Sequence, residues 1–180
     1  MEIKESLYQA IKEYGEKEIL SDIAQGESSM TINTIYHHCL SNLEKSEKIN
    51  SEIRGSLAEG LAHYMLTVAL IPSQRKTELK SVEIDISVPD TKTLVSSPDE
   101  VILIVFLKTD NKNAIKEKLD KLKKIQPKAE NIWAVIDESI PIDVKLYTLD
   151  KEKFTFSNII NDLISFTSNT KQSKLKIFRI

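Results

Sequence analysis

The sequence is poor in cysteine, in glycine and in long apolar stretches. Its 180 residues include one cysteine and four glycines, and no run approaches the roughly 20 apolar residues that span a bilayer. The single Cys39 excludes an internal disulfide and is typical of a reducing compartment. So few glycines leave no Gly-rich phosphate loop, and the Walker and dinucleotide-binding fingerprints are absent. The charged segment 1–5 does not resemble a signal peptide, so we expect a soluble, cytoplasmic protein without membrane contact.

The composition is that of a globular domain. Hydrophobic residues make up 41% and charged residues 29% of the chain, and the length suits one core better than two. Lys, Glu and Ile are abundant, which is an archaeal-like, thermophile-like composition. We expect one α/β domain over residues 1–180, with a helical N-terminal extension at 1–50 and the core at 51–180.

Lysines are concentrated in one segment, although the net charge is only −2. That near-neutral sum argues against a strongly electrostatic nucleic-acid binder. Within 111–128, however, Glu117 and Asp120 are outnumbered by Lys112, Lys116, Lys118, Lys121, Lys123, Lys124 and Lys128. Such asymmetry is typical of contact with an anionic partner, and Lys116, Lys123 and Lys124 are the candidates for binding DNA or RNA. The alternative is a solvated lysine face on a surface helix.

Apolar residues recur every three or four positions through the N-terminal half, a pattern that predicts amphipathic helices. The expected helices are 3–14, one that starts at a Ser29 or Thr31 cap and ends near residue 43, and 49–68. Pro72 ends the third helix. We interpret the polar tract 73–77 as the boundary between the helical half and a sheet.

The first predicted strand has one polar face. Residues 81–88 alternate between apolar and polar side chains, which is typical of a strand with one solvated side. The pattern predicts that Glu83, Asp85 and Ser87 share that side.

The strongest strand signal is the unbroken apolar run at 101–107, as in a strand buried on both faces. A lysine-rich helix at 115–125 and an apolar strand at 132–136 follow, which predicts a right-handed parallel crossover. We expect 101–107 to be central, between 81–88 and 132–136. The remaining predictions are a turn or short hairpin at 89–99, a strand at 144–149, a helix at 156–164, and an edge strand or ordered tail around Leu175 and Ile177.

The order of helix, half-polar strand, buried strand ending in a lysine, helix and buried strand resembles the PD-(D/E)XK nuclease superfamily. This superfamily includes restriction enzymes and archaeal Holliday junction resolvases. The resemblance covers about residues 52–137 and implies a restriction-endonuclease-like fold, a small mixed sheet flanked by helices. It also implies that Asp85 holds Mg²⁺, that the helix acid Glu59 assists, and that Lys108 orients the attacking water or steadies the phosphate.

One position departs from the superfamily pattern. The acid-x-Lys triplet is Phe106-Leu107-Lys108, with an apolar ring where Mg²⁺ requires an oxygen ligand. Alternation makes Glu83 the first substitute as a metal ligand beside Asp85. Asp90 and Asp110 are further candidates.

Simpler interpretations stand beside this one. Glu83 and Asp85 can line a solvated face, Lys108 can be a lysine that reaches water from a strand end, and Glu59 with His63 can be a surface pair. Neighbouring positions in the segment 37–39, His-His-Cys, point about 100° apart on a helix, so a zinc site is not expected. We therefore expect a divergent or inactive Mg²⁺-dependent endonuclease. The alternatives are a non-catalytic protein- or nucleic-acid-binding module and a homo-oligomer, such as a homodimer, that pairs through its N-terminal helices.

Overall fold

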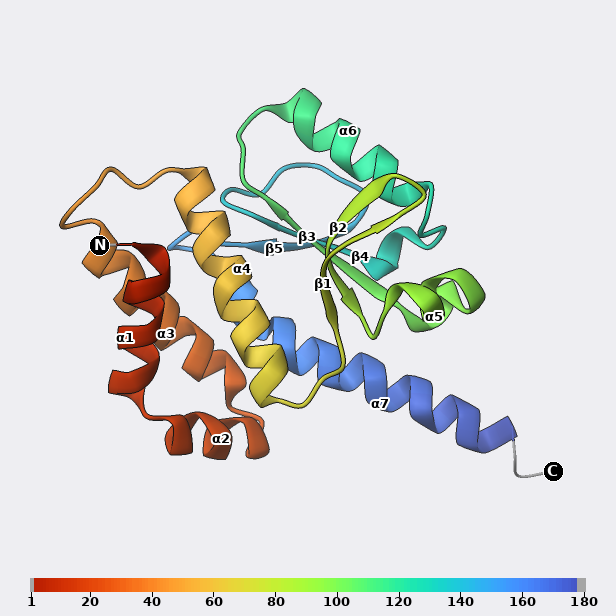
Figure 1. Ribbon diagram of the computed structural model, residues 1–180, viewed down its shortest axis with the longest axis horizontal. Helices are drawn as coiled ribbons and strands as arrows, with labels where there is room; N and C mark the ends of the chain where they lie inside the picture. The colour runs from red at the N-terminus through yellow and green to blue at the C-terminus, as the bar shows by residue number, and fades with distance from the viewer. Residues whose placement is uncertain (1, 178–180) are drawn as a thin grey trace.

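The computed structural model describes residues 2–177, and for 172–177 the backbone alone. A five-stranded sheet, in the order β1-β2-β3-β4-β5, lies between two helical layers (Figure 1). On one side lies α6 (Lys112–Lys123); on the other lie α4 (Ser51–Val68) and α7 (Ile159–Ile177). The sequence-based prediction of a small mixed sheet flanked by helices is confirmed.

Three helices precede α4, and they are α1 (Ile3–Tyr14), α2 (Glu16–Ala24) and α3 (Ser28–Leu43). Gly15, with a φ of 100°, separates α1 from α2, a backbone conformation that L side chains rarely adopt. Buried residues of α1, α2 and α3 belong to the same apolar cluster as those of α4 and of one sheet face. Asn50 caps α4, because its side chain accepts a hydrogen bond from the Ile53 backbone N–H.

The strands are β1 (Gln74–Leu79), β2 (Val82–Val88), β3 (Ile102–Leu107), β4 (Ile132–Ile136) and β5 (Lys145–Thr148). The prediction that β3 is central is confirmed: it pairs antiparallel with β2 and parallel with β4. The chain reaches β4 from β3 through α6, so the predicted parallel crossover is also confirmed. β5 pairs parallel with β4 at one edge, and β1 pairs antiparallel with β2 at the other.

Three sequence-based predictions are wrong. The tract 73–77 is not a boundary, because most of it lies in the edge strand β1. The segment 89–99 is not a hairpin but contains the short helix α5 (Thr91–Ser96), whose N-terminus is capped by Asp90. Residues 175 and 177 lie in α7 rather than in an edge strand, since no glycine or proline interrupts the helix from 159 onwards. Although α7 is 19 residues long, no helix of the described chain is long and apolar enough to cross a membrane.

Along strand β2, the even-numbered side chains change from one face of the sheet to the other. Val82 and Ile84 pack in the apolar cluster that includes α6, whereas Ile86 and Val88 pack in the cluster that includes α4. Even-numbered residues of a regular strand would share one face. The change coincides with a gap in the β1–β2 pairing at Lys76 and Asp85, with the same register on both sides, and with a φ of 49° at Lys76. The predicted polar face is therefore wrong for Ser87, which is completely buried and lies opposite Leu103.

Candidate functional site

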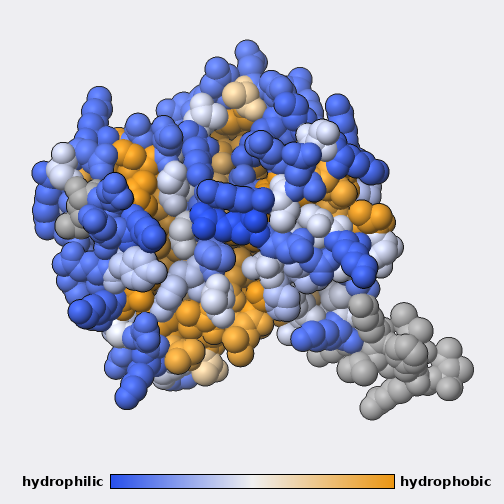
Figure 2. Space-filling view, in the orientation of Figure 1, coloured by the Kyte–Doolittle hydropathy of each residue, from blue (hydrophilic) through white to orange (hydrophobic). Residues whose placement is uncertain are grey.

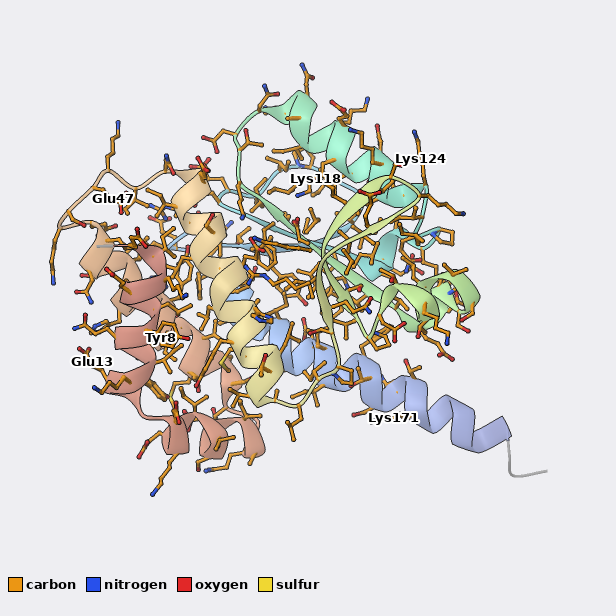
Figure 3. The ribbon with its side chains drawn as sticks, in the orientation of Figure 1. Tyr8, Glu13, Glu47, Lys118, Lys124 and Lys171 are labelled. Atoms are coloured by element: carbon orange, nitrogen blue, oxygen red, sulfur yellow. The ribbon has the colours of Figure 1, made fainter. Side chains whose placement is uncertain are left out.

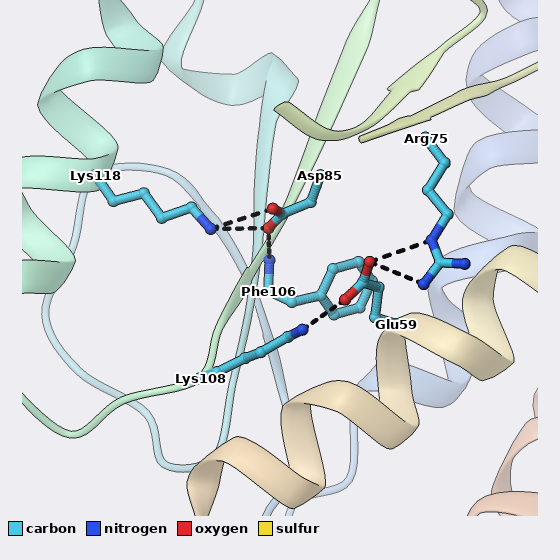
Figure 4. Close-up of polar contacts among 6 residues, drawn as sticks. All are labelled: Glu59, Arg75, Asp85, Phe106, Lys108 and Lys118. Atoms are coloured by element: carbon cyan, nitrogen blue, oxygen red, sulfur yellow. Dashed lines mark hydrogen bonds and ion pairs between the residues drawn. The ribbon is translucent and has the colours of Figure 1, made fainter. Parts of the chain in front are cut away.

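A pocket of about 340 Å³ lies where α4, the β1–β2 pair and the end of β3 meet. Its walls bring together Glu59 from α4, Glu83 and Asp85 from β2, and Lys108 just after β3. These are the four residues that the sequence singled out for catalysis or metal binding. Lys76, Thr77, Glu78 and Ile84 complete the lining. Figure 4 shows how the charged groups divide into two sets, one around Glu59 and one around Asp85.

Glu59 is the most deeply buried acid of the pocket, with a relative exposure of 4%. Its Oε2 accepts a hydrogen bond of 2.6 Å from Lys108 Nζ, and its Oε1 accepts two from Arg75, at 3.1 Å from Nη2 and 3.2 Å from Nε. Burial raises the pKa of Glu59, but the hydrogen bonds and charges of Lys108 and Arg75 outweigh that effect and lower its pKa overall. Glu59 is therefore an ionised carboxylate held between two cations.

Gly55 allows Lys108 to reach Glu59. Gly55 lies one helical turn before Glu59 in α4, and a Cβ on Gly55 would come within 2.8 Å of Lys108 Cγ. Any larger residue would force Lys108 to move, so the contact between helix and strand end depends on the missing side chain.

Asp85 is held by a different cation and by the backbone of β3. Its Oδ2 accepts a hydrogen bond of 2.8 Å from the Phe106 backbone N–H. Lys118 Nζ, from α6, lies 3.2 Å from Oδ1 and 3.0 Å from Oδ2. The β2–β3 register ends at the Ile86–Ile104 pair, so beyond that point the Asp85 side chain takes the place of a strand partner for Phe106.

Phe106 occupies the position of the missing acid. Its side chain is 1% exposed and belongs to the apolar cluster on the α4 side of the sheet. Lys108, two residues later, also reaches the α4 side, where it contacts Glu59, although Phe106 itself is not among the residues that line the pocket. An apolar ring supplies no ligand to a hard divalent cation there.

The donor set does not fit Mg²⁺ as it stands. Both oxygens of Glu59 and both oxygens of Asp85 already accept from cations of the same chain. Glu83 is exposed and pairs in register with Glu78 on β1. Within the described part of the chain, no three His, Cys, Asp or Glu side chains are grouped closely enough to share a metal ion.

The other proposed acids serve other contacts. Asp90 caps α5 through the Thr93 backbone N–H. Asp110 accepts a hydrogen bond from Ser51 at the start of α4, in a second pocket that also contains Asp137. Burial raises the pKa of Asp137, and Asp110 adds to this rise while Arg54 opposes it.

The predicted nucleic-acid-binding lysines lie on other sides of α6 from Lys118. Lys116 and Lys123 line a groove of about 680 Å³ with the loop 140–143, and Lys123 pairs with Asp143 at 2.6 Å. Lys124 follows the last turn of α6, whereas Lys118 lies on the side of the helix that faces the sheet (Figure 3). Their role in binding stays a prediction.

Sequence reasoning missed two residues of the site, Arg75 and Lys118. Arg75 was hidden because the polar tract around it does not look like a strand. The sequence pattern does not distinguish Lys118 from the other lysines of its segment, although its position beside Leu119, three residues after Ile115, borders the buried stripe of the helix. That border position is the one signal that could have identified it.

The element order, the mixed sheet and the position of the site define a restriction-endonuclease-like fold. Among solved structures, the chain is similar to the restriction endonuclease PspGI in complex with its substrate DNA, with a TM-score of 0.62 over 94% of each chain. Sequence identity is 15%, so this similarity establishes the fold alone. No protein-family model matches the chain, and no curated protein matches it in sequence.

Proposed function

We propose that this protein binds DNA as a divergent member of the PD-(D/E)XK nuclease-like proteins and has lost vigorous Mg²⁺-dependent cleavage. The fold supports DNA binding, since the restriction endonuclease to which the chain is structurally similar is in a complex with substrate DNA. A pocket lined by a strand Asp, a helix Glu and a lysine supports a phosphodiester as the group that lies there.

The single observation that carries the loss of cleavage is Phe106. Phosphodiester cleavage by this chemistry requires a metal ion that neutralises developing charge and activates a water molecule. With a buried ring at the acid position and Glu59 and Asp85 each paired with cations, Mg²⁺ would have to displace internal salt bridges. Asp85 and Glu83 or Glu59 would be its remaining ligands, and Lys108 would steady the phosphate.

The test is a comparison of binding and cleavage on the same substrates. Linear duplex, single-stranded and four-way branched DNA, with an RNA duplex in parallel, are incubated with the protein in Mg²⁺, in Mn²⁺ and in EDTA. We expect DNA binding in all three conditions and little or no cleavage in any. A preference for the branched substrate would support the archaeal Holliday junction resolvase type within the superfamily.

Two outcomes would contradict this proposal in different ways. Robust Mg²⁺-dependent cleavage that Asp85→Ala abolishes would make the chain an active nuclease. Absence of binding to every nucleic acid, even at low salt, would favour the non-catalytic protein-binding module.

Homodimer formation is a second candidate, favoured by apolar side chains that the fold leaves exposed. Leu70, after α4, is 88% exposed, and Leu20 of α2 is 54% exposed. Figure 2 shows a hydrophobic patch where α2 and the end of α4 meet, and Tyr8 of α1 is a further exposed ring (Figure 3). Sedimentation compares the oligomeric state of the wild type with that of Leu20→Lys/Leu70→Lys. The double variant should be monomeric if the wild type dimerises through this patch.

A further inference from the structure

Lys118 holds Asp85 in a way that none of the superfamily's roles explains. Its ammonium group lies 3.2 Å and 3.0 Å from the two oxygens of one carboxylate, so it bridges them. The Asp85 carboxylate is also held from the other side, because its Oδ2 accepts a hydrogen bond of 2.8 Å from the Phe106 backbone N–H. Rotation away from Lys118 would break this hydrogen bond. Lys118 Nζ thus occupies the position beside the Asp85 oxygens at which a nuclease of this fold would bind a metal ion.

Lys118 is unlike the other lysines of α6. Lys121 pairs with Glu117 of its own helix, and Lys123 pairs with Asp143 of a loop. The Lys118 side chain is 37% exposed and that of Asp85 22%, so their pair is partly sheltered, whereas Lys121 and Glu117 are 55% and 68% exposed. A sheltered ion pair is screened less by salt and water than an exposed one.

The two acids that a metal ion would use, Glu59 and Asp85, are already paired with cations, and the exposed Glu78 and Glu83 also line the pocket. Glu59 is neutralised by Lys108 and Arg75, and Lys76 lies on the pocket wall. Thr77 also lines the pocket, and its buried hydroxyl has no hydrogen-bond partner among the described residues. Ammonium groups and a hydroxyl are suitable partners for a phosphate oxygen.

We propose that Lys118 replaces the metal ion of this site, so that the pocket binds a phosphodiester without a divalent cation. The inference rests on the proposed function, because it takes Asp85 as the metal-ligand position of a nuclease-like site. The internal ammonium supplies positive charge beside Asp85, and Lys76 supplies it on another wall of the pocket. Removing the Lys118 charge should leave Asp85 with an uncompensated carboxylate that can take up a metal ion.

The experiment measures Mn²⁺ binding by calorimetry and by thermal shift in the absence of DNA. Wild-type protein is expected to show no saturable response to Mn²⁺, whereas Lys118→Met should bind Mn²⁺ at least about tenfold more tightly and gain thermal stability when it does. The double variant Lys118→Met/Asp85→Asn should lose this response. Lys116→Met is the matched control, since it removes the same charge from the same helix without touching Asp85.

A Lys118→Met protein that is folded but as indifferent to Mn²⁺ as the wild type would overturn the inference, and so would a wild type that binds Mn²⁺ equally well. Lys118→Gln gives the same comparison with a polar side chain should the methionine variant fold poorly. DNA binding by the wild type in EDTA is measured separately. Its failure would reject the proposed function, whereas failure of the Mn²⁺ response alone would reject only the role of Lys118.

Discussion

Glu59 shows how a catalytic-looking carboxylate becomes a structural one. It is 4% exposed, and its two oxygens are shared between Lys108 after β3 and Arg75 on β1. Both cations keep about a third of their side chains in solvent, so the cost of desolvating the group falls mainly on Glu59. The three residues tie α4 to two strands, and this tie should contribute to stability as long as Glu59 is ionised.

The stability that Glu59 contributes should depend on pH. Its pKa is lower in the folded chain than the ordinary 4.5, so the contribution is fully present above about pH 4.5 and is lost as pH falls through the folded pKa. At pH 7 we expect Glu59→Gln to lower the free energy of unfolding by about 1–3 kcal/mol, as for a hydrogen bond to a charged group. Urea melts of both proteins at pH 7 and pH 3 measure the difference, which should shrink at pH 3.

Glu117→Gln is the control for that experiment, because Glu117 pairs with Lys121 in an exposed i,i+4 contact and should leave the melts unchanged at both pH values. An equal cost of Glu59→Gln at pH 7 and pH 3 would show that the loss comes from packing rather than from charge.

The sequence predicts those site residues whose place follows from the periodicity of their own strand or helix. Asp85 and Lys108 stand at strand positions that alternation and the apolar run define, and Glu59 lies on a long amphipathic helix. Their partners could not be found in the same way. Which lysine of α6 reaches Asp85 depends on how β2 changes the direction of its side chains, and no periodicity reveals the gap in strand pairing at Lys76.

At the scale of elements, the contact between α4 and the end of β3 positions the site. Leu57, Leu61 and Met65 of α4 are completely buried in the apolar cluster that also includes one face of the sheet, which fixes the position of the helix. In that position only glycine fits opposite Lys108, because a Cβ at Gly55 would lie 2.8 Å from Lys108 Cγ and 3.5 Å from its Cα.

Gly55→Ala and Gly60→Ala should therefore have different effects on the free energy of unfolding, although both are interior positions of α4. Alanine favours a helix over glycine by about 0.5–1 kcal/mol. At Gly55 overpacking costs about 1–3 kcal/mol, so we expect a net loss in the free energy of unfolding. At Gly60 the nearest atom is the end of the flexible Leu7 side chain at 3.3 Å, so we expect no loss or a gain. Stabilisation by Gly55→Ala in denaturant melts would contradict the close approach.

The strands also show which elements a sequence can reveal. β3 is six consecutive buried residues at the centre of the sheet, and its pattern admits one interpretation. β1 is mostly exposed and pairs on one side only, so its residues need not be apolar and nothing marks them as a strand. α5 has six residues, too few for periodicity, and Asp90 as its cap was the only available signal.

At the scale of the whole molecule, the distribution of charge over the surface matters more than the net charge. The net charge is −2, the pocket walls carry acids as well as lysines, and hydrophilic side chains cover β1 (Figure 2). The basic residues lie on α6, where Lys118 pairs with Asp85 of the pocket and Lys116 and Lys123 lie beside the loop 140–143. DNA that reaches the pocket would pass along α6, so the lysines away from Asp85 are expected to contact the phosphate backbone.

The salt dependence of DNA binding tests that surface. Each phosphate contact with duplex DNA contributes about 0.9 to the slope of log affinity against log salt. Reversing the charge at Lys116, Lys123 and Lys124 should weaken binding and flatten the slope by up to about three such contacts. The matched control reverses the exposed Lys4, Lys12 and Lys17 of the N-terminal helices, which changes the net charge equally. If both triple variants flatten the slope alike, overall charge rather than α6 governs binding; if neither does, α6 is a solvated face and DNA contacts another surface.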